Sequence, residues 1–289
     1  MENSRIKYYI LFLIMIYSAG CETDVENVDL PDFKQMLAIT AFISPLDSTS
    51  YFFVTSNKKL YGELNTEKPL GNLTGFISDG SNEVALDTIK TGFKISHEKM
   101  PVKYGKTYNL KVSSENGLSA EGTCTVPAKR SFLIEADTFS FIQHDPRGLI
   151  YRSIDVLLKF SDFPGEENYY RIFYKIAGYN NKNTFNKKWE RTIFSSFENE
   201  YFTDKGNDGK EIVQKTIRSL NSYSSEDSVF LKIYLFNTEK SYYLYHKSMN
   251  DYKDGSDPFS EATPVYSNIS GGLGVFTSYT VDSLIVRLK

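Results

Sequence analysis

Short apolar and β-branched stretches recur along most of the chain, and polar turns separate them. In Tyr108-Asn109-Leu110-Lys111-Val112 the apolar residues alternate with polar ones, which is the pattern of a half-buried strand. Asn116-Gly117 follows, and this dipeptide between alternating stretches is a strong hairpin signal. The expected strands are 36–43, 51–55, 73–77, 83–89, 107–112, 118–126, 150–160, 170–176, 189–197, 211–217, 229–236 and 279–288. This pattern predicts an all-β chain.

One segment near the C-terminal end departs from this pattern. Its large side chains recur at the spacing of one helix face, in Tyr242, Tyr245, Met249 and Tyr252. We therefore expect a helix over about 239–253, capped by Asn237 or Thr238 and ended by Gly255. The large side chains are expected to pack in a core rather than to form a binding face.

The length of 289 residues suits two domains. Strands at regular spacing over residues 36–127 favour an immunoglobulin-like or fibronectin-like β-sandwich. Residues 131–289 form the second predicted domain, which is β-rich and carries the helix. The expected fold class is thus all-β, with two β-sandwich-like domains.

The N-terminal residues have the order of a secretory signal. Arg5 and Lys7 precede the apolar stretch 8–17, and the small residues Ser18-Ala19-Gly20 come next. The apolar stretch is about half the roughly 20 residues that a transmembrane helix needs. We predict a cleaved signal peptide over residues 1–20, with an uncleaved N-terminal anchor as the alternative.

A cysteine follows the predicted signal peptide directly. Ser18-Ala19-Gly20-Cys21 resembles a bacterial lipobox, in which the thiol is acylated, so residues 21–35 are expected to form a lipidated tether. Glu22 and Asp24 resemble the surface-export signal of Bacteroidota lipoproteins, and an ordinary solvated tether is the alternative. The expected location is the outer membrane, with the lipid on Cys21 and the protein facing the cell exterior.

Composition and charge narrow the class of protein further. The chain is 40% hydrophobic and 24% charged with a net charge of −3, which excludes a disordered tail and a polytopic membrane protein. A slightly acidic chain has no electrostatic footprint for nucleic acid. Once Cys21 is acylated, Cys124 has no partner for an internal disulfide, and we expect it to be a small buried hydrophobic residue.

No motif for catalysis, a metal or a cofactor stands out. His97-Glu98 begins like a zinc-protease helix but lacks the second histidine. The segment 204–209 resembles a calcium loop faintly, but Lys215 occupies the position where such a loop needs Glu, so a hairpin turn is favoured. A solvated turn is likewise favoured over a cation site for Asp251, Asp254 and Asp257. We therefore predict no enzyme activity, no metal and no cofactor.

Three glycines precede the last expected strand. Gly271, Gly272 and Gly274 permit positive φ or close approach of the backbone. Gly272-Leu273-Gly274 lacks the third glycine of a dinucleotide fingerprint, where Thr277 stands instead. A structural turn that leads into the final strand is favoured over a ligand-binding loop.

The segment 256–276 is the most distinctive part of the chain, and it contains Asp257-Pro258-Phe259-Ser260-Glu261 and Tyr266-Ser267-Asn268-Ile269 before the glycines. With Asp29-Leu30-Pro31 and the end of the first domain at Cys124 to Pro127, it resembles the Bacteroidota lipoprotein family called domain of unknown function 4249. The resemblance implies an outer-membrane surface lipoprotein whose genes often lie beside TonB-dependent transporters. It implies no catalytic residues, because no activity is established for that family.

The expected function is therefore non-enzymatic. A surface lipoprotein could assist a TonB-dependent transporter, either by ligand capture or by covering the barrel mouth. The alternatives are a cell-surface adhesion or matrix module and, third, a secreted-type hydrolase, and the ligand could be a small molecule, a peptide or a glycan. Exposed tyrosines would supply contact area for a partner. The candidates are Tyr169, Tyr179, Tyr201, Tyr223 and Tyr243, and aromatic cross-strand pairing is the alternative role for them.

Overall fold

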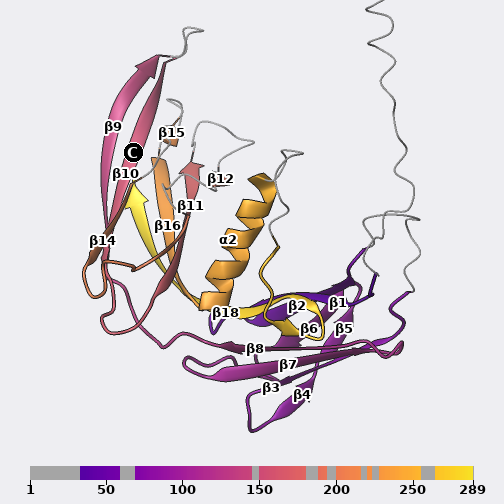
Figure 1. Cartoon of the computed structure of the whole chain (residues 1–289). Helices are drawn as coiled ribbons and strands as arrows, with labels where there is room; N and C mark the ends of the chain where they lie inside the picture. Colours follow the sequence, from indigo (N-terminus) through magenta and orange to yellow (C-terminus); the bar gives the residue numbers. More distant parts are fainter. Residues whose placement is uncertain are drawn as a thin grey trace, which may run out of the picture. The chain divides into compact units, whose positions relative to one another are not determined.

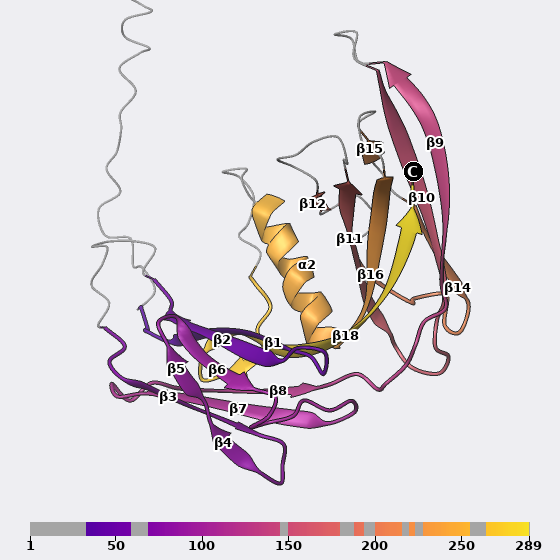
Figure 2. The same ribbon diagram turned by 180° about the vertical axis from the view of Figure 1, so that it is seen from behind.

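The structure is a computed structural model, and it describes residues 33–58, 69–144, 150–179, 188–193, 200–215, 220–222, 228–254 and 264–288. All of these except the first two residues belong to one unit, Gln35–Lys58 with Glu67–Lys289. Figures 1 and 2 show that this part of the chain consists mostly of strands in several sheets, with one described helix near the C-terminal end. The all-β prediction with a late helix is confirmed at this level.

The first core lies between two antiparallel groups of strands, β1-β2-β6-β5 and β8-β7-β3-β4. Their bounds are β1 (Leu37–Ile43), β2 (Thr49–Ser56), β3 (Leu73–Ser78), β4 (Glu83–Ala85), β5 (Asp87–Ile89), β6 (Gly92–Ser96), β7 (Thr107–Ser114) and β8 (Ser119–Thr125). The predicted alternation in β7 is confirmed, since Tyr108, Leu110 and Val112 are buried. Cys124 on β8 is also buried, as expected.

The stretch predicted as one strand over 83–89 is two strands. β4 pairs with β3, whereas β5 pairs with β6 in the other sheet. Leu86 lies between them, with its side chain buried and its backbone N–H donating to the carbonyl of Gly75 over 2.8 Å. The chain thus passes from one sheet to the other at Leu86, which a continuous apolar pattern cannot reveal.

The second core lies between a four-stranded sheet around β10 and the strands β11 and β16. The strands that build this region are β9 (Ile134–His144), β10 (Ile150–Ser161), β11 (Tyr169–Tyr179), β12 (Lys188–Ile193), β13 (Tyr201–Thr203), β14 (Glu211–Lys215), β15 (Leu220–Ser222) and β16 (Ser228–Thr238). Val156, Leu158 and Phe160 supply the buried face of β10 in this core. They pack in one cluster with buried residues of β11 and β16, among them Ile172 and Ile233.

The last strand connects the two cores. β18 (Leu273–Arg287) pairs in parallel with β1 through residues 273–278 and then antiparallel with β16 through residues 279–287. The short β17 (Ile269–Ser270) pairs with β8. One nine-stranded sheet therefore runs through both regions. The predicted boundary at 127–131 stays a prediction, but strand pairing adds residues 269–278 to the first pair of sheets.

The helix α2 (Lys240–Asp254) lies where the sequence predicts it. Of the predicted helix face, Tyr242 is buried, whereas Tyr252 is 55% exposed. The predicted cap differs, because Thr238 belongs to β16 and its hydroxyl donates to the carbonyl of Tyr169. The carbonyl of Glu239 instead accepts the first backbone hydrogen bond of the helix, from Tyr242 over 3.0 Å.

Candidate functional site

The predicted lipidation and export residues, Cys21, Glu22 and Asp24, lie outside the described residues, as does the predicted signal peptide. Their roles stay predictions. In the described part of the chain, no helix has both the length and the apolar character needed to cross a membrane.

The predicted glycine turn lies where β18 first runs beside β1. Gly271 and Gly274 have φ of +72° and +102°, which side chains rarely adopt. A Cβ atom on Gly272 would lie 2.6 Å from the carbonyl oxygen of Leu37, and one on Gly274 would overlap that of Ile39. At each of these three positions the neighbouring strands leave no room for a Cβ atom, which explains why the residue is glycine.

Asn268, from the same distinctive segment, fastens this turn to the sheets. Its amide nitrogen donates to the carbonyl of Phe276 over 2.8 Å, and its amide oxygen accepts from the N–H of Phe276 over 3.0 Å. The amide nitrogen also lies 3.3 Å from the carbonyl of Thr123 on β8. The Tyr-Ser-Asn-Ile motif singles out this residue. The sequence does not reveal that its two partners, Phe276 and Thr123, lie on two different strands.

A second polar group joins α2, β18 and the end of β8. The Glu239 carboxylate accepts from the N–H of Thr125 over 3.2 Å and from the hydroxyl of Thr277 over 3.1 Å. The Ser278 hydroxyl donates to the Thr125 carbonyl over 2.9 Å. Burial raises the pKa of Glu239 above its ordinary value, and these hydrogen bonds oppose that rise. The arrangement fixes the point where β18 changes its pairing partner.

A mostly buried ion pair holds α2 against the outer face of β11. The Arg171 guanidinium donates from Nε and Nη2 to one Glu200 oxygen over 3.0 and 2.8 Å, and from Nη1 to the Tyr242 hydroxyl over 2.6 Å. The two charged side chains are only 17% and 13% exposed. The guanidinium also lies 5.0 Å from the ring centre of Tyr201. Sequence periodicity gives no sign of this pairing.

His246 lies beside this ion pair, with its ring stacked on Tyr201 at 4.9 Å between ring centres. Its Nδ1 lies 2.9 Å from the carbonyl oxygen of Tyr242, which can only accept, so Nδ1 carries the hydrogen. Burial lowers the pKa of His246 to about 4. The ring is therefore neutral near pH 7, and its contacts are those of a packing residue.

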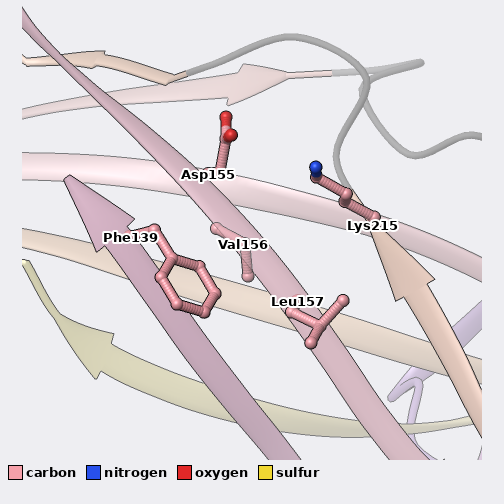
Figure 3. A pocket seen from close by; sticks show the side chains of 5 residues that line it. All are labelled: Phe139, Asp155, Val156, Leu157 and Lys215. Atoms are coloured by element: carbon pink, nitrogen blue, oxygen red, sulfur yellow. The ribbon is translucent and has the colours of Figure 1, made fainter. Parts of the chain in front are cut away.

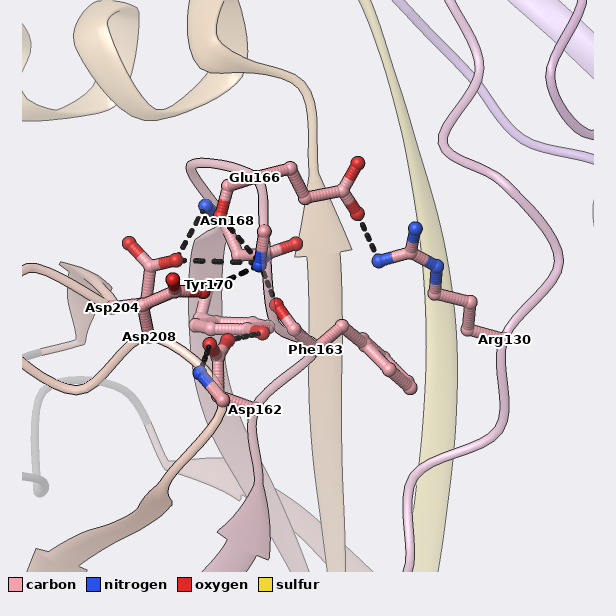
Figure 4. Close-up of polar contacts among 10 residues, drawn as sticks. Arg130, Asp162, Phe163, Glu166, Asn168, Tyr170, Asp204 and Asp208 are labelled. Carbon is pink, nitrogen blue, oxygen red and sulfur yellow. Dashed lines mark hydrogen bonds and ion pairs between the residues drawn. The ribbon is translucent and has the colours of Figure 1, made fainter.

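Three carboxylates meet where two loops of the second region approach each other (Figure 4). The acceptor oxygens of Asp162, Asp204 and Asp208 lie within 4.8 Å of one another, and the first two residues are buried. Such oxygens could hold a hard cation. Each carboxylate already accepts a backbone hydrogen bond, from Gly209 to Asp162, from Asn168 to Asp204 and from Gly165 to Asp208.

Through these hydrogen bonds, the three carboxylates hold the backbone of the two loops in place. The segment 204–209 is a turn, but it is not the predicted hairpin, because β13 pairs with β11 and β14 pairs with β10. The sequence could not place Asp162 there, since that residue is 42 positions before Asp204.

The β9 strand of the β9-β10 hairpin carries exposed apolar side chains on both of its faces. Phe139, Phe141 and Ile142 of β9 are 58%, 39% and 65% exposed. β9 pairs with β10 alone among the described strands, so its other edge is unpaired in that part of the chain. The hairpin lies at the end of its sheet (Figures 1 and 2). We call these three residues the apolar arm.

Phe139 of this arm also lines a hollow of about 330 Å³ on the outer face of the β9-β10-β14 sheet. Phe139 and Leu157 form its apolar side, and Asp155 and Lys215 form its charged side (Figure 3). Strand pairing explains the grouping, since Asp155 is opposite Phe139 and Leu157 is opposite Lys215. Sequence reasoning missed this site because it predicted no strand over 134–144.

The described tyrosines of this group pack on other rings, so the prediction that they are exposed is wrong for them. Tyr169 is buried, Tyr201 stacks on His246, and Tyr243 is half-buried against Tyr169. Tyr223 and the side chain of Tyr179 lie outside the described part. The cause is α2, because its His246 covers Tyr201 and its Tyr243 packs on Tyr169.

The described residues define a mostly β protein in which one late strand joins two cores and one helix packs on the shared sheet. The model of the family described as "Domain of unknown function (DUF4249)" matches residues 23–285. The chain belongs to this family, and the predicted resemblance is confirmed.

One solved structure is 10% identical and covers 71% of this chain and 97% of its own, with a TM-score of 0.21. It is described as "Structural basis for the promiscuous specificity of the carbohydrate-binding modules from the beta-sandwich super family". A similarity this low supports no conclusion about this chain. Among curated proteins, none matches it significantly.

Proposed function

We propose that this protein is a lipid-anchored lipoprotein of the outer-membrane surface that assists a TonB-dependent transporter without being an enzyme. The N-terminal pattern that ends at Cys21 supports the anchor, and Glu22 and Asp24 support export to the surface. The protein would capture a ligand for the transporter or cover the mouth of its barrel. An immunoglobulin-like arrangement of the first pair of sheets is the finer fold assignment that we propose with it.

The apolar arm is the observation that supports partnership most directly. Large exposed apolar side chains on an unpaired edge strand favour association with another chain, and proteins usually protect such edges. Phe141 and Ile142 point to opposite faces of β9, so a partner that covers the strand would contact both. A lipid on Cys21 would hold the protein and the barrel in one membrane, which raises their effective concentration. A modest contact at the arm would then suffice.

Co-purification from the native membrane tests this proposal. A tagged wild-type protein, extracted gently, should recover a TonB-dependent barrel, and Phe141→Ser with Ile142→Ser should lose it. Phe53→Ser is the matched control, because Phe53 is 50% exposed on β2, away from the arm. Recovery of the lipoprotein alone, even after cross-linking, would contradict the proposal and favour the adhesion module.

The anchor can be tested in the same strains. A lipid analogue fed to cells should label the wild type but leave Cys21→Ala unlabelled. Protease treatment of intact cells should remove the wild-type protein, whereas a variant with Glu22→Ala and Asp24→Ala should be protected. Equal labelling of Cys21→Ala, or resistance of the wild type to protease, would contradict anchoring or export respectively.

A further inference from the structure

The β9 strand presents a long and regular edge. All eleven of its residues pair one-to-one with residues of β10, so no bulge interrupts the strand. It contains no proline, lysine or arginine, and its two carboxylates, Glu135 and Asp137, lie near its start. Proline, bulges and charged side chains are the features by which proteins usually keep an edge strand from pairing. Most of β9 therefore lacks the features that prevent the addition of another strand.

The other edge of β10 shows which backbone groups of β9 face outwards. In an antiparallel pair, the N–H and C=O of one residue point to the same neighbouring strand, and successive residues alternate. The N–H of Asp162, directly after β10, donates to the carbonyl of Lys210 over 2.9 Å and so continues the β10-β14 ladder. Even-numbered residues of β10 therefore point to β14, and odd-numbered ones point to β9. By the register, odd-numbered residues of β9 point to β10 and even-numbered ones point to the free edge.

A contact at the start of the hairpin agrees with this assignment. Phe132 lies two residues before β9, and its N–H donates to the Asp282 carboxylate of β18 over 3.1 Å. This even-numbered N–H thus points away from β10 and has a partner on the outer side. Further along, even-numbered positions from Ala136 to Ile142 present backbone donors and acceptors over about 20 Å of edge. Among the described strands, β10 alone pairs with β9.

We infer that the transporter binds this edge as an added strand, through an extended segment that pairs with residues 136–142. An extended backbone matches the edge because it offers a donor and an acceptor at every second residue, as in other complexes formed by strand addition. The backbone groups of β9 that the partner removes from water then receive hydrogen bonds. The inference rests on the proposed function and specifies how its partner binds.

The side chains beside the edge restrict the sequence of that segment. Phe139 and Phe141 lie on the outer face of the sheet, and Ile142 lies on the opposite face. Aromatic and β-branched side chains stabilise one another across neighbouring strands. The segment should therefore carry such side chains on both of its faces. A closed barrel leaves none of its wall strands with a free edge, so the segment belongs to a loop or an end of the transporter chain.

Amide hydrogen exchange, measured residue by residue, tests the inference on the unaltered protein. The full-length lipoprotein is compared alone and in complex with the barrel that co-purifies with it. The amides of Thr138, Ser140 and Ile142 should exchange at least about tenfold more slowly in the complex. The amides of Phe139 and Phe141 bond to β10 and should be protected in both samples. Contact through side chains alone would not slow the even-numbered amides selectively.

A proline variant tests the same hydrogen bonds independently. Thr138→Pro removes one outward N–H but no hydrogen bond between β9 and β10, and edge strands tolerate proline at such positions. It should weaken recovery of the barrel about three- to tenfold, the effect of one lost hydrogen bond. Thr138→Ala keeps the N–H and is the matched control. Unchanged thermal unfolding would show that the hairpin is intact, and the exchange measurement decides the question if Thr138→Pro destabilises it.

The possible outcomes separate the inference from the proposed function. Selective slowing at the even-numbered positions, with reduced recovery by Thr138→Pro, would support strand addition. The inference alone is overturned if the barrel co-purifies but these amides exchange equally fast in the complex and in the free protein. It is also overturned if a folded Thr138→Pro recovers as much barrel as Thr138→Ala. If the wild type recovers no barrel, the proposed function is wrong and the inference fails with it.

Discussion

Gly274 lies where β18 comes closest to β1, and its backbone conformation is one that only glycine adopts readily. Gly274→Ala should therefore lower the melting temperature strongly, because both the positive φ and the overlap with the Ile39 carbonyl oppose a Cβ atom. We expect a loss of more than about 1 kcal/mol in the free energy of unfolding.

Gly80→Ala provides the matched control, since Gly80 has φ of +85° but no atom within 4 Å of an added Cβ. It should destabilise the protein less. Equal melting temperatures for the two variants would show that the close approach of β18 to β1 is not what requires glycine.

His246 gives stability a pH dependence of known sign. Burial lowers its pKa from 6.5 to about 4, so the unfolded chain takes up a proton at a higher pH than the folded protein. Its contribution is complete above pH 6.5 and is lost as the pH falls towards 4. The loss is at most about 3 kcal/mol.

Denaturant unfolding of wild type and His246→Gln at pH 7.5 and 4.5 measures this effect. Glu239 acts in the opposite direction, because its raised pKa favours the folded state as the pH falls. The difference between wild type and variant isolates His246 from such groups. The account is wrong if the two proteins lose the same stability on acidification.

At the scale of elements, contacts made by the first turns of α2 hold the helix against the sheet. Arg171 joins Tyr242 of the helix to Glu200, and Phe42 of β1 packs on Tyr242 with 5.4 Å between ring centres. Arg171→Leu should cost about 1 to 3 kcal/mol, because the mostly buried Glu200 carboxylate loses the two hydrogen bonds that the guanidinium donates to it. Hydrogen exchange at the amides of residues 240–254 should accelerate.

The double variant Arg171→Leu with Glu200→Leu should recover part of that stability, since it removes both charges. The Lys99–Asp87 pair supplies the comparison, because both of its side chains are well exposed and Lys99→Leu should change stability by less than about 1 kcal/mol. Unchanged exchange in α2 after Arg171→Leu would contradict this account of how the helix is held.

The sequence pattern predicts where strands and the helix lie better than it predicts which strands pair with one another. The alternation in β7 and the spacing of Tyr242 identified a strand and a helix, because these signals are local. The sequence pattern predicts no strand at β9, because Phe139, Phe141 and Ile142 do not form the buried face on which a strand prediction relies.

At the scale of the whole described unit, β18 is the feature that no local pattern could have shown. The sequence predicted a strand from 279, whereas the strand begins at Leu273 and uses its first residues in the first core, where Phe276 is buried. Alternation identifies a strand face but not the neighbouring strand. The distinctive segment was recognised correctly as a family motif, and its glycines and Asn268 owe their positions to that neighbouring strand.

The central claim at this scale is that the apolar arm contacts a TonB-dependent barrel in the outer membrane. Site-specific photo-cross-linking in living cells tests it most directly, with a benzophenone amino acid at position 141 and, as the control, at position 53. Mass spectrometry of the products identifies the partner. We predict a cross-link to a TonB-dependent transporter from position 141 and none from position 53. Cross-links only to other molecules, or the same products from both positions, would contradict the claim.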